Sequence, residues 1–77
     1  MLLERGEKMI RTYLMNLRKQ QNESQQDTAT ALGITRQYYT AIEAGERQKR
    51  MDITLAAMLA QHFNIPISEI LKNELEY

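Results

Sequence analysis

Two adjacent polar side chains, Arg36 and Gln37, have the hydrogen-bonding groups needed to recognise the edges of DNA bases. An arginine guanidinium matches the two major-groove acceptors of guanine, and a glutamine amide matches the donor and acceptor of adenine. Thr40 follows one helical turn after Arg36 and could add a methyl or hydroxyl contact. Tyr38 points to the flank of this segment, where its hydroxyl could reach a phosphate. The alternative for each residue is an ordinary exposed position on a helix.

These side chains need short helices that hold them at a fixed angle. Gly33 follows an apolar, helix-compatible run from Thr28 to Leu32, where a chain that leaves a helix often needs a left-handed residue. Thr35 then offers a hydroxyl that can cap the next helix. Helices so close in sequence must cross steeply, and Ala29 is small enough to let them approach. Residues 24–45 therefore predict a helix-turn-helix, which is a DNA-binding motif.

The composition argues against several other classes of protein. The chain has 77 residues, so we expect one domain over residues 1–77. It contains no cysteine and one histidine, which excludes disulfides and makes a zinc site improbable. Without a nucleophile paired with a base, and without a glycine loop for phosphates, we expect no enzyme activity and no cofactor. Nor does the sequence indicate a domain for a small-molecule ligand.

The sequence has no apolar run near the roughly 20 residues that a membrane span requires. The initial Met1-Leu2-Leu3 is interrupted at once by Glu4 and Arg5, which is not typical of a signal peptide. We therefore expect a soluble cytoplasmic protein, associated with the nucleoid if it binds DNA.

Charge is distributed unevenly along the chain although the formal net charge is zero. Residues 36–50 carry four basic side chains against two acidic ones, whereas residues 51–77 carry one lysine against four acidic ones. DNA responds to the local field, which is screened beyond about 10 Å, and not to the net charge. The basic region around Arg36 is therefore compatible with DNA binding.

The sequence predicts an all-α fold, a compact bundle of about five short helices. The only proline is Pro66, and no segment alternates apolar and polar residues as a strand would. Ser24 can cap the second helix, with Asp27 completing a capping box. Residues before Glu7 and after Leu71 are expected to fray. The other helices are expected at Lys8–Gln21, about Arg36–Ala44, Ile53–Phe63 and Pro66–Leu71.

Apolar spacing predicts which face of each helix is buried. The first helix presents Ile10, Leu14, Leu17 and Gln21 on one stripe, and the third turns Tyr39 and Ile42 inward. The core face of the fourth helix is expected to consist of Ile53, Ala56, Leu59, Ala60 and Phe63.

From Leu14 to Leu71 the chain resembles the XRE family, the phage-repressor and Cro type of helix-turn-helix domain, whose fold is lambda-repressor-like. Three departures from the family pattern are Thr28 in place of a leucine, a longer segment from Glu46 to Asp52, and Asn64 in place of a glycine. The matching landmarks are Leu17-Arg18, Ser24-Gln25, Ala29, Leu32-Gly33, Thr35, Ile42-Glu43-Ala44-Gly45, Ala60, and Ile65 through Leu71.

This resemblance implies roles for particular residues. Gln25, at the start of the second helix, would bind a phosphate. The loop after the third helix would contact the DNA backbone. Arg18 and Glu43 would form a structural ion pair between the first and third helices. The complete predicted DNA-binding set is Gln25, Thr35, Arg36, Gln37, Tyr38, Thr40, Arg47, Lys49 and Arg50.

The fourth helix has a second apolar stripe, formed by Leu55, Met58 and His62. A helix that is apolar on two sides normally packs against two neighbours. One possibility is coverage by residues 1–3 or by Leu75 and Tyr77. The other is a homodimer interface that also includes Ile67, Ile70 and Leu71 of the last helix.

Taken together, the residues and the resemblance predict a sequence-specific transcription regulator that binds double-stranded DNA as a homodimer. We expect a repressor of the prophage or mobile-element kind. The alternative is an antitoxin or adaptor whose main partner is another protein, bound by the Leu55 and Met58 stripe or by the acidic C-terminal end.

Overall fold

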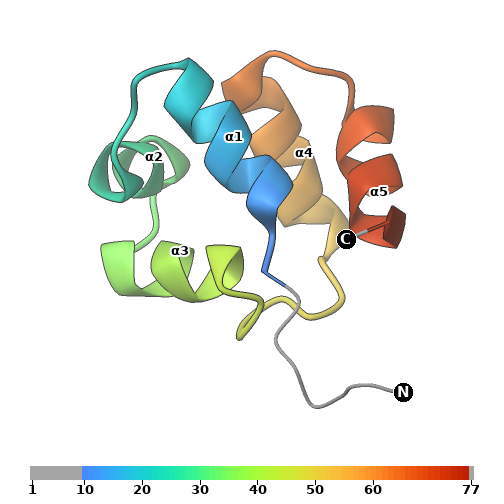
Figure 1. Ribbon diagram of the computed structural model, residues 1–77, viewed down its shortest axis with the longest axis horizontal. Helices are drawn as coiled ribbons and strands as arrows, with labels where there is room; N and C mark the ends of the chain where they lie inside the picture. The colour runs from blue at the N-terminus through green and yellow to red at the C-terminus, as the bar shows by residue number, and fades with distance from the viewer. Residues whose placement is uncertain (1–9, 77) are drawn as a thin grey trace.

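The computed structural model describes residues 10–76, which form five helices and contain no strand within that range (Figure 1). This confirms the predicted all-α fold. The helices are α1 (Thr12–Gln20), α2 (Gln25–Leu32), α3 (Arg36–Glu43), α4 (Ile53–Phe63) and α5 (Ile67–Glu76).

Side-chain caps fix where three of the helices begin. The Ser24 hydroxyl accepts a hydrogen bond from the backbone N–H of Asp27 at 3.0 Å, and the Asp27 carboxylate accepts one from the Ser24 N–H at 2.9 Å. This is the predicted capping box of α2. Thr35 and Asp52 cap α3 and α4 through the N–H of the third helical residue. Local sequence therefore sets the starts of α2, α3 and α4.

Left-handed residues turn the chain between helices. Gly33 ends α2 with a φ of 73°, and Asn64 ends α4 with a φ of 58°. Asparagine tolerates this conformation better than most residues with a side chain, which explains how it can stand in place of a glycine. The turn at Gly33 leaves only three residues between α2 and α3, so the two helices lie next to each other (Figure 1).

The core lies where α1, α2, α3 and α4 meet, and α5 packs against the outer side of α4 (Figure 1). Tyr39 and Ile42 point inward from α3 as predicted, and both are fully buried. The buried apolar residues are Leu14, Ala29, Leu32, Tyr39, Ile42, Leu55, Ala56, Leu59, Ala60, Phe63 and Ile70.

Helix α1 begins later than predicted. It starts at Thr12, so Ile10 precedes the helix, does not share its stripe and is 52% exposed. Arg11 is completely buried instead, and its backbone N–H donates to the carbonyl of Glu43 at 2.8 Å. The predicted start at Lys8 lies outside the described residues.

Three expectations about α4 and α5 were also wrong. Ile53 is 63% exposed, because it is the first residue of α4 and lies beyond the packed part of that helix. Leu55 is buried and joins the core face. The last helix does not end at Leu71 but continues to Glu76, and Glu74 forms an ion pair with Arg11 near its end.

Candidate nucleic-acid interface

The outer face of α3 carries the residues predicted to contact bases. Arg36, Gln37 and Thr40 are exposed, whereas Tyr39 on the opposite face is completely buried. Together with Gln25 from the start of α2, these three side chains line an open hollow of about 330 Å³. The capped α3 therefore presents hydrogen-bonding groups on a helix whose other face is fixed by the core.

Gln25 connects the start of α2 to α3. Its side-chain amide donates to Oε1 of Glu43 at 3.0 Å, and its amide oxygen accepts from the hydroxyl of Thr40 at 3.0 Å. Both polar atoms of the Gln25 side chain are therefore engaged within the protein. The backbone N–H groups of Gln25 and Gln26, in the first turn of α2, have no carbonyl partner within the helix. An anion could approach them, favoured by the helix dipole.

Arg18 and Glu43 lie together in a buried ion pair between α1 and α3. Nε of Arg18 is 2.7 Å from Oε2 of Glu43, and Nη2 is 3.3 Å from Oε1. Arg18 also donates to the backbone carbonyl of Glu23 at 3.0 Å. Burial by itself would raise the pKa of Glu43, but Arg18, the nearby hydroxyl of Tyr39 and the amide of Gln25 together lower it. The carboxylate is therefore ionised at neutral pH and fixes the end of α3 to α1.

The basic loop, which we define as residues 44–52 between α3 and α4, carries the other predicted phosphate contacts. Arg47, Lys49 and Arg50 are all exposed there. In Figure 1 this loop leaves the end of α3 and runs along the lower edge of the molecule. Its backbone is held by Arg11, whose guanidinium donates to the carbonyl of Arg47 at 3.0 Å. The loop thus continues the exposed face of α3 with three cationic side chains.

A model of the helix-turn-helix family matches residues 14–70, which is well over half of the chain. The chain belongs to the XRE-type helix-turn-helix family. It is therefore a DNA-binding transcription regulator of XRE type, and the matched domain is a regulatory one and not a catalytic one. A comparison with curated proteins gives no match.

In this XRE-type domain, the Tyr38 hydroxyl has a partner within the protein. It accepts a hydrogen bond at 2.7 Å from the side chain of Gln48, whose amide oxygen accepts from the backbone N–H of Asp52 at 3.0 Å. Tyr38 is half-buried and packs against the core. Tyr38 therefore connects α3 to the basic loop. A phosphate contact would use the same hydroxyl that accepts from Gln48.

Thr28, which departs from the leucine usual in the XRE family, is completely buried. Its hydroxyl donates to Oε1 of Glu23 at 2.7 Å, and the same oxygen lies 2.7 Å from Nε2 of His62. Burial raises the pKa of Glu23, but the contacts from His62 and Thr28 outweigh it and the net shift is downward. The polar substitution in α2 is therefore compensated by a carboxylate from the preceding turn.

Two of the residues predicted to form a dimer interface of the XRE-type domain are buried within the single chain. Leu55 is 6% exposed and Ile70 is fully buried, so both belong to the core of the single chain. Met58 and Ile67 are half-buried, and Leu71 is 39% exposed. The packing of α5 against α4 explains the burial of Ile70, whereas Leu55 lies on the side of α4 that meets Ile34 and Tyr38.

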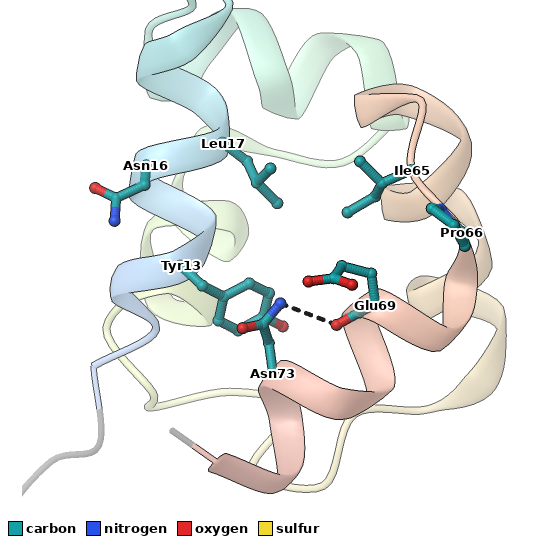
Figure 2. Close-up of a pocket in the computed structure, with 7 residues that line it drawn as sticks. All are labelled: Tyr13, Asn16, Leu17, Ile65, Pro66, Glu69 and Asn73. Carbon is teal, nitrogen blue, oxygen red and sulfur yellow. Dashed lines mark hydrogen bonds between the residues drawn. The ribbon is translucent and has the colours of Figure 1, made fainter.

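A groove between α1 and α5 lies away from the exposed face of α3. It has a volume of about 350 Å³, and Figure 2 shows Leu17 and Ile65 on its two sides, with Tyr13 and Glu69 below them. The amide of Asn73 donates to the backbone carbonyl of Glu69 at 2.9 Å within the same helix. None of the predicted DNA-binding residues lines this groove.

Sequence reasoning missed Arg11 and Gln48. Gln48 has a φ of 56°, and its side chain organises the basic loop, but nothing in the local sequence marks a glutamine for that role. Arg11 fell on no predicted stripe, and its carboxylate partner Glu74 lies 63 residues away. Nothing in the local sequence marks Arg11 as a buried residue.

No metal site is formed by histidine, cysteine, aspartate or glutamate among residues 10–76. Over the same residues, no helix is long and apolar enough to cross a membrane.

Proposed function

We propose that this protein is a homodimeric repressor that binds a specific operator by placing α3 in the major groove. The observation that carries the proposal is the face of α3, where Arg36, Gln37 and Thr40 are exposed beside the N-terminus of α2 in an XRE-type domain. Arg36 would contact guanine and Gln37 adenine. The resemblance to phage repressors supports a role in a prophage or another mobile element.

Phosphate contacts would position α3 on the duplex without specifying its sequence. We assign them to the N-terminus of α2, at Gln25, and to the basic loop, through Arg47, Lys49 and Arg50. Thr35 lies at the start of α3, where its hydroxyl accepts from the N–H of Tyr38. We propose that Thr35 contributes to DNA binding by fixing the first turn of α3, from which Arg36 and Gln37 extend.

Two-fold symmetry would let two copies of α3 enter successive major grooves, about 34 Å apart. Exposed apolar residues on α4 and α5 support such an interface. Leu71 is 39% exposed and Leu75, one turn further along α5, is 88% exposed, while Ile53 at the start of α4 is 63% exposed. We propose that Leu71 lies at this interface, with Met58 and Ile67 at its edge.

The first experiment is selection from a randomised duplex library, followed by sequencing, with wild-type protein and an Arg36→Ala/Gln37→Ala variant. A matched control is Gln61→Ala/Lys72→Ala, which removes an amide and a cation from exposed positions on α4 and α5. We expect a two-fold symmetric motif from the wild type and the control, and its loss in the α3 variant. Enrichment of no motif, even at low salt, would contradict the proposal and favour a protein partner.

The dimer has its own test, which is light scattering after size-exclusion chromatography at high micromolar concentration. We expect the mass of two chains for the wild type and of one chain for Leu71→Glu. A wild-type monomer at that concentration would contradict the dimer but would leave DNA binding by a single domain intact.

A further inference from the structure

The guanidinium of Arg11 contacts the backbone at the end of α3 and in the basic loop. Arg11 is completely buried, and Nη1 donates to the carbonyl of Ile42 at 2.8 Å and to that of Arg47 at 3.0 Å. Nη2 donates to the carbonyl of Gln48. These three carbonyls belong to the last turn of α3 and to the basic loop that follows it. One side chain thus fixes the course of the backbone as it leaves α3.

The other edge of the same guanidinium binds α5. Nε of Arg11 is 2.7 Å from Oε2 of Glu74, and Nη2 is 2.9 Å from Oε1, which makes the pair bidentate. The Tyr13 hydroxyl also donates to Oε2 of Glu74. The side chain of Glu74 is only 11% exposed. Because a buried arginine needs a carboxylate to balance its charge, the position of Arg11 depends on α5 being docked.

The arrangement requires an arginine, because a planar guanidinium can contact carbonyls along one edge and a carboxylate along the other. A lysine keeps the charge but has no such fork. Gln48 adds a second restraint, since its side chain joins Tyr38 of α3 to the backbone of Asp52. Between these anchors, Lys49 and Arg50 extend into solvent from a backbone that is held on both sides.

We propose that Arg11 and Glu74 are positioning residues for phosphate binding, which hold the basic loop in the conformation that contacts the DNA backbone. Contact between the loop and phosphate then depends on the C-terminal helix α5, although Glu74 is an anion and does not itself contact DNA. This inference rests on the proposed DNA binding and extends it from the exposed cations to the buried pair that orients them.

The first test needs no DNA. Amide hydrogen exchange is measured on folded Glu74→Gln and on Glu76→Gln, which removes the same charge from an exposed position on the same helix. We expect exchange of the residue 46–50 amides to accelerate at least roughly threefold relative to the core amides of α2 in Glu74→Gln. Glu76→Gln should match the wild type. Equal acceleration in the loop and in α2 would mean a purely global role and would overturn the proposal.

The second test measures affinity for DNA in a double-mutant cycle that combines Glu74→Gln with Lys49→Ala/Arg50→Ala. If the pair acts through the loop, Glu74→Gln weakens binding in the wild-type background and has little further effect once the loop cations are gone. If the combined variant instead loses affinity by the product of the two separate losses, the pair and the loop act independently and the proposal is overturned. A third outcome is that hydrogen exchange of the loop accelerates in Glu74→Gln, but neither Glu74→Gln nor Lys49→Ala/Arg50→Ala alters the affinity for DNA. The loop would then not contact DNA, which contradicts the proposed function, whereas the restraint of the loop by Arg11 would stand.

A milder variant covers the case in which Glu74→Gln does not fold. Tyr13→Phe removes the hydroxyl that donates to Glu74, and it leaves the bidentate pair of Arg11 and Glu74 intact. We expect a smaller acceleration of exchange that is again confined to residues 46–50. Unchanged exchange of the loop in Tyr13→Phe, together with an Arg11→Lys variant that binds DNA as the wild type does, would overturn the proposal.

Discussion

Nε of Arg18 in α1 lies 2.7 Å from Oε2 of Glu43 at the end of α3, and this buried ion pair connects two residues that are 25 positions apart in sequence. Glu43 also accepts from Gln25 at the start of α2, so one carboxylate joins three helices. The orientation of α3 relative to α2, and hence the shape of the surface offered to DNA, depends on this carboxylate.

Removing one partner of this pair should strongly destabilise the protein. We expect Arg18→Met to lower the free energy of unfolding by about 3 kcal/mol, because it leaves the Glu43 carboxylate buried without a cation. Arg18→Met/Glu43→Leu should be less destabilised than Arg18→Met alone, since no uncompensated charge remains. Chemical denaturation followed by circular dichroism measures both. Additive losses in the double variant would contradict this account.

Acid should destabilise the fold through the same carboxylate. The pKa of Glu43 is below its ordinary value of 4.5, because Arg18, Tyr39 and Gln25 outweigh the effect of burial. The folded state therefore binds this proton more weakly than the unfolded chain does. The stabilisation is fully present above about pH 4.5 and is lost as the pH falls through the folded-state pKa.

Denaturation curves between pH 7 and pH 2 test this pH dependence. We expect the free energy of unfolding to decrease below about pH 4.5, and Glu43→Gln to show a shallower decrease from a lower starting stability. Equal slopes for Glu43→Gln and the wild type would show that other carboxylates, such as Glu23, account for the acid sensitivity.

The turn between α2 and α3 should tolerate asparagine better than alanine. Gly33 has a φ of 73°, and a Cβ at this position would meet no atom within 4 Å, so the cost of a side chain is conformational and not steric. Gly33→Ala should cost about 1–2 kcal/mol of stability, and Gly33→Asn less. Thermal unfolding compares the two variants. A Gly33→Ala variant as stable as the wild type would contradict the assigned backbone strain.

Base and phosphate contacts should be separable by mutation. Gln37→Ala should cost ~1–3 kcal/mol of binding energy and relax the preference at one base pair. Lys49→Ala should weaken binding to all sequences alike and reduce the salt dependence of the binding constant by about one unit of slope. Binding titrations on the selected operator, on single-base variants and at several salt concentrations measure both effects. The same pattern for the two variants would contradict the division of roles.

Local sequence determined most of the helix-turn-helix. The hydroxyls of Ser24 and Thr35, the glycine at position 33 and the inward spacing of Tyr39 and Ile42 act over a few residues, so they could be recognised without a structure. The extent of the family match, residues 14–70, agrees closely with the expected 14–71.

Tertiary structure decided what depends on contacts between distant segments. Glu74, near the end of α5, forms an ion pair with Arg11, which is 63 residues away in sequence, and no local pattern marks either residue. Leu55 became core because it lies beside Ile34 and Tyr38, which come from the turn before α3 and from α3 itself. Ile53 became exposed because it is the first residue of its helix. Short-range hydrogen bonds and turn geometry are encoded where they occur, whereas burial and charge pairing follow from which surfaces meet when the helices pack.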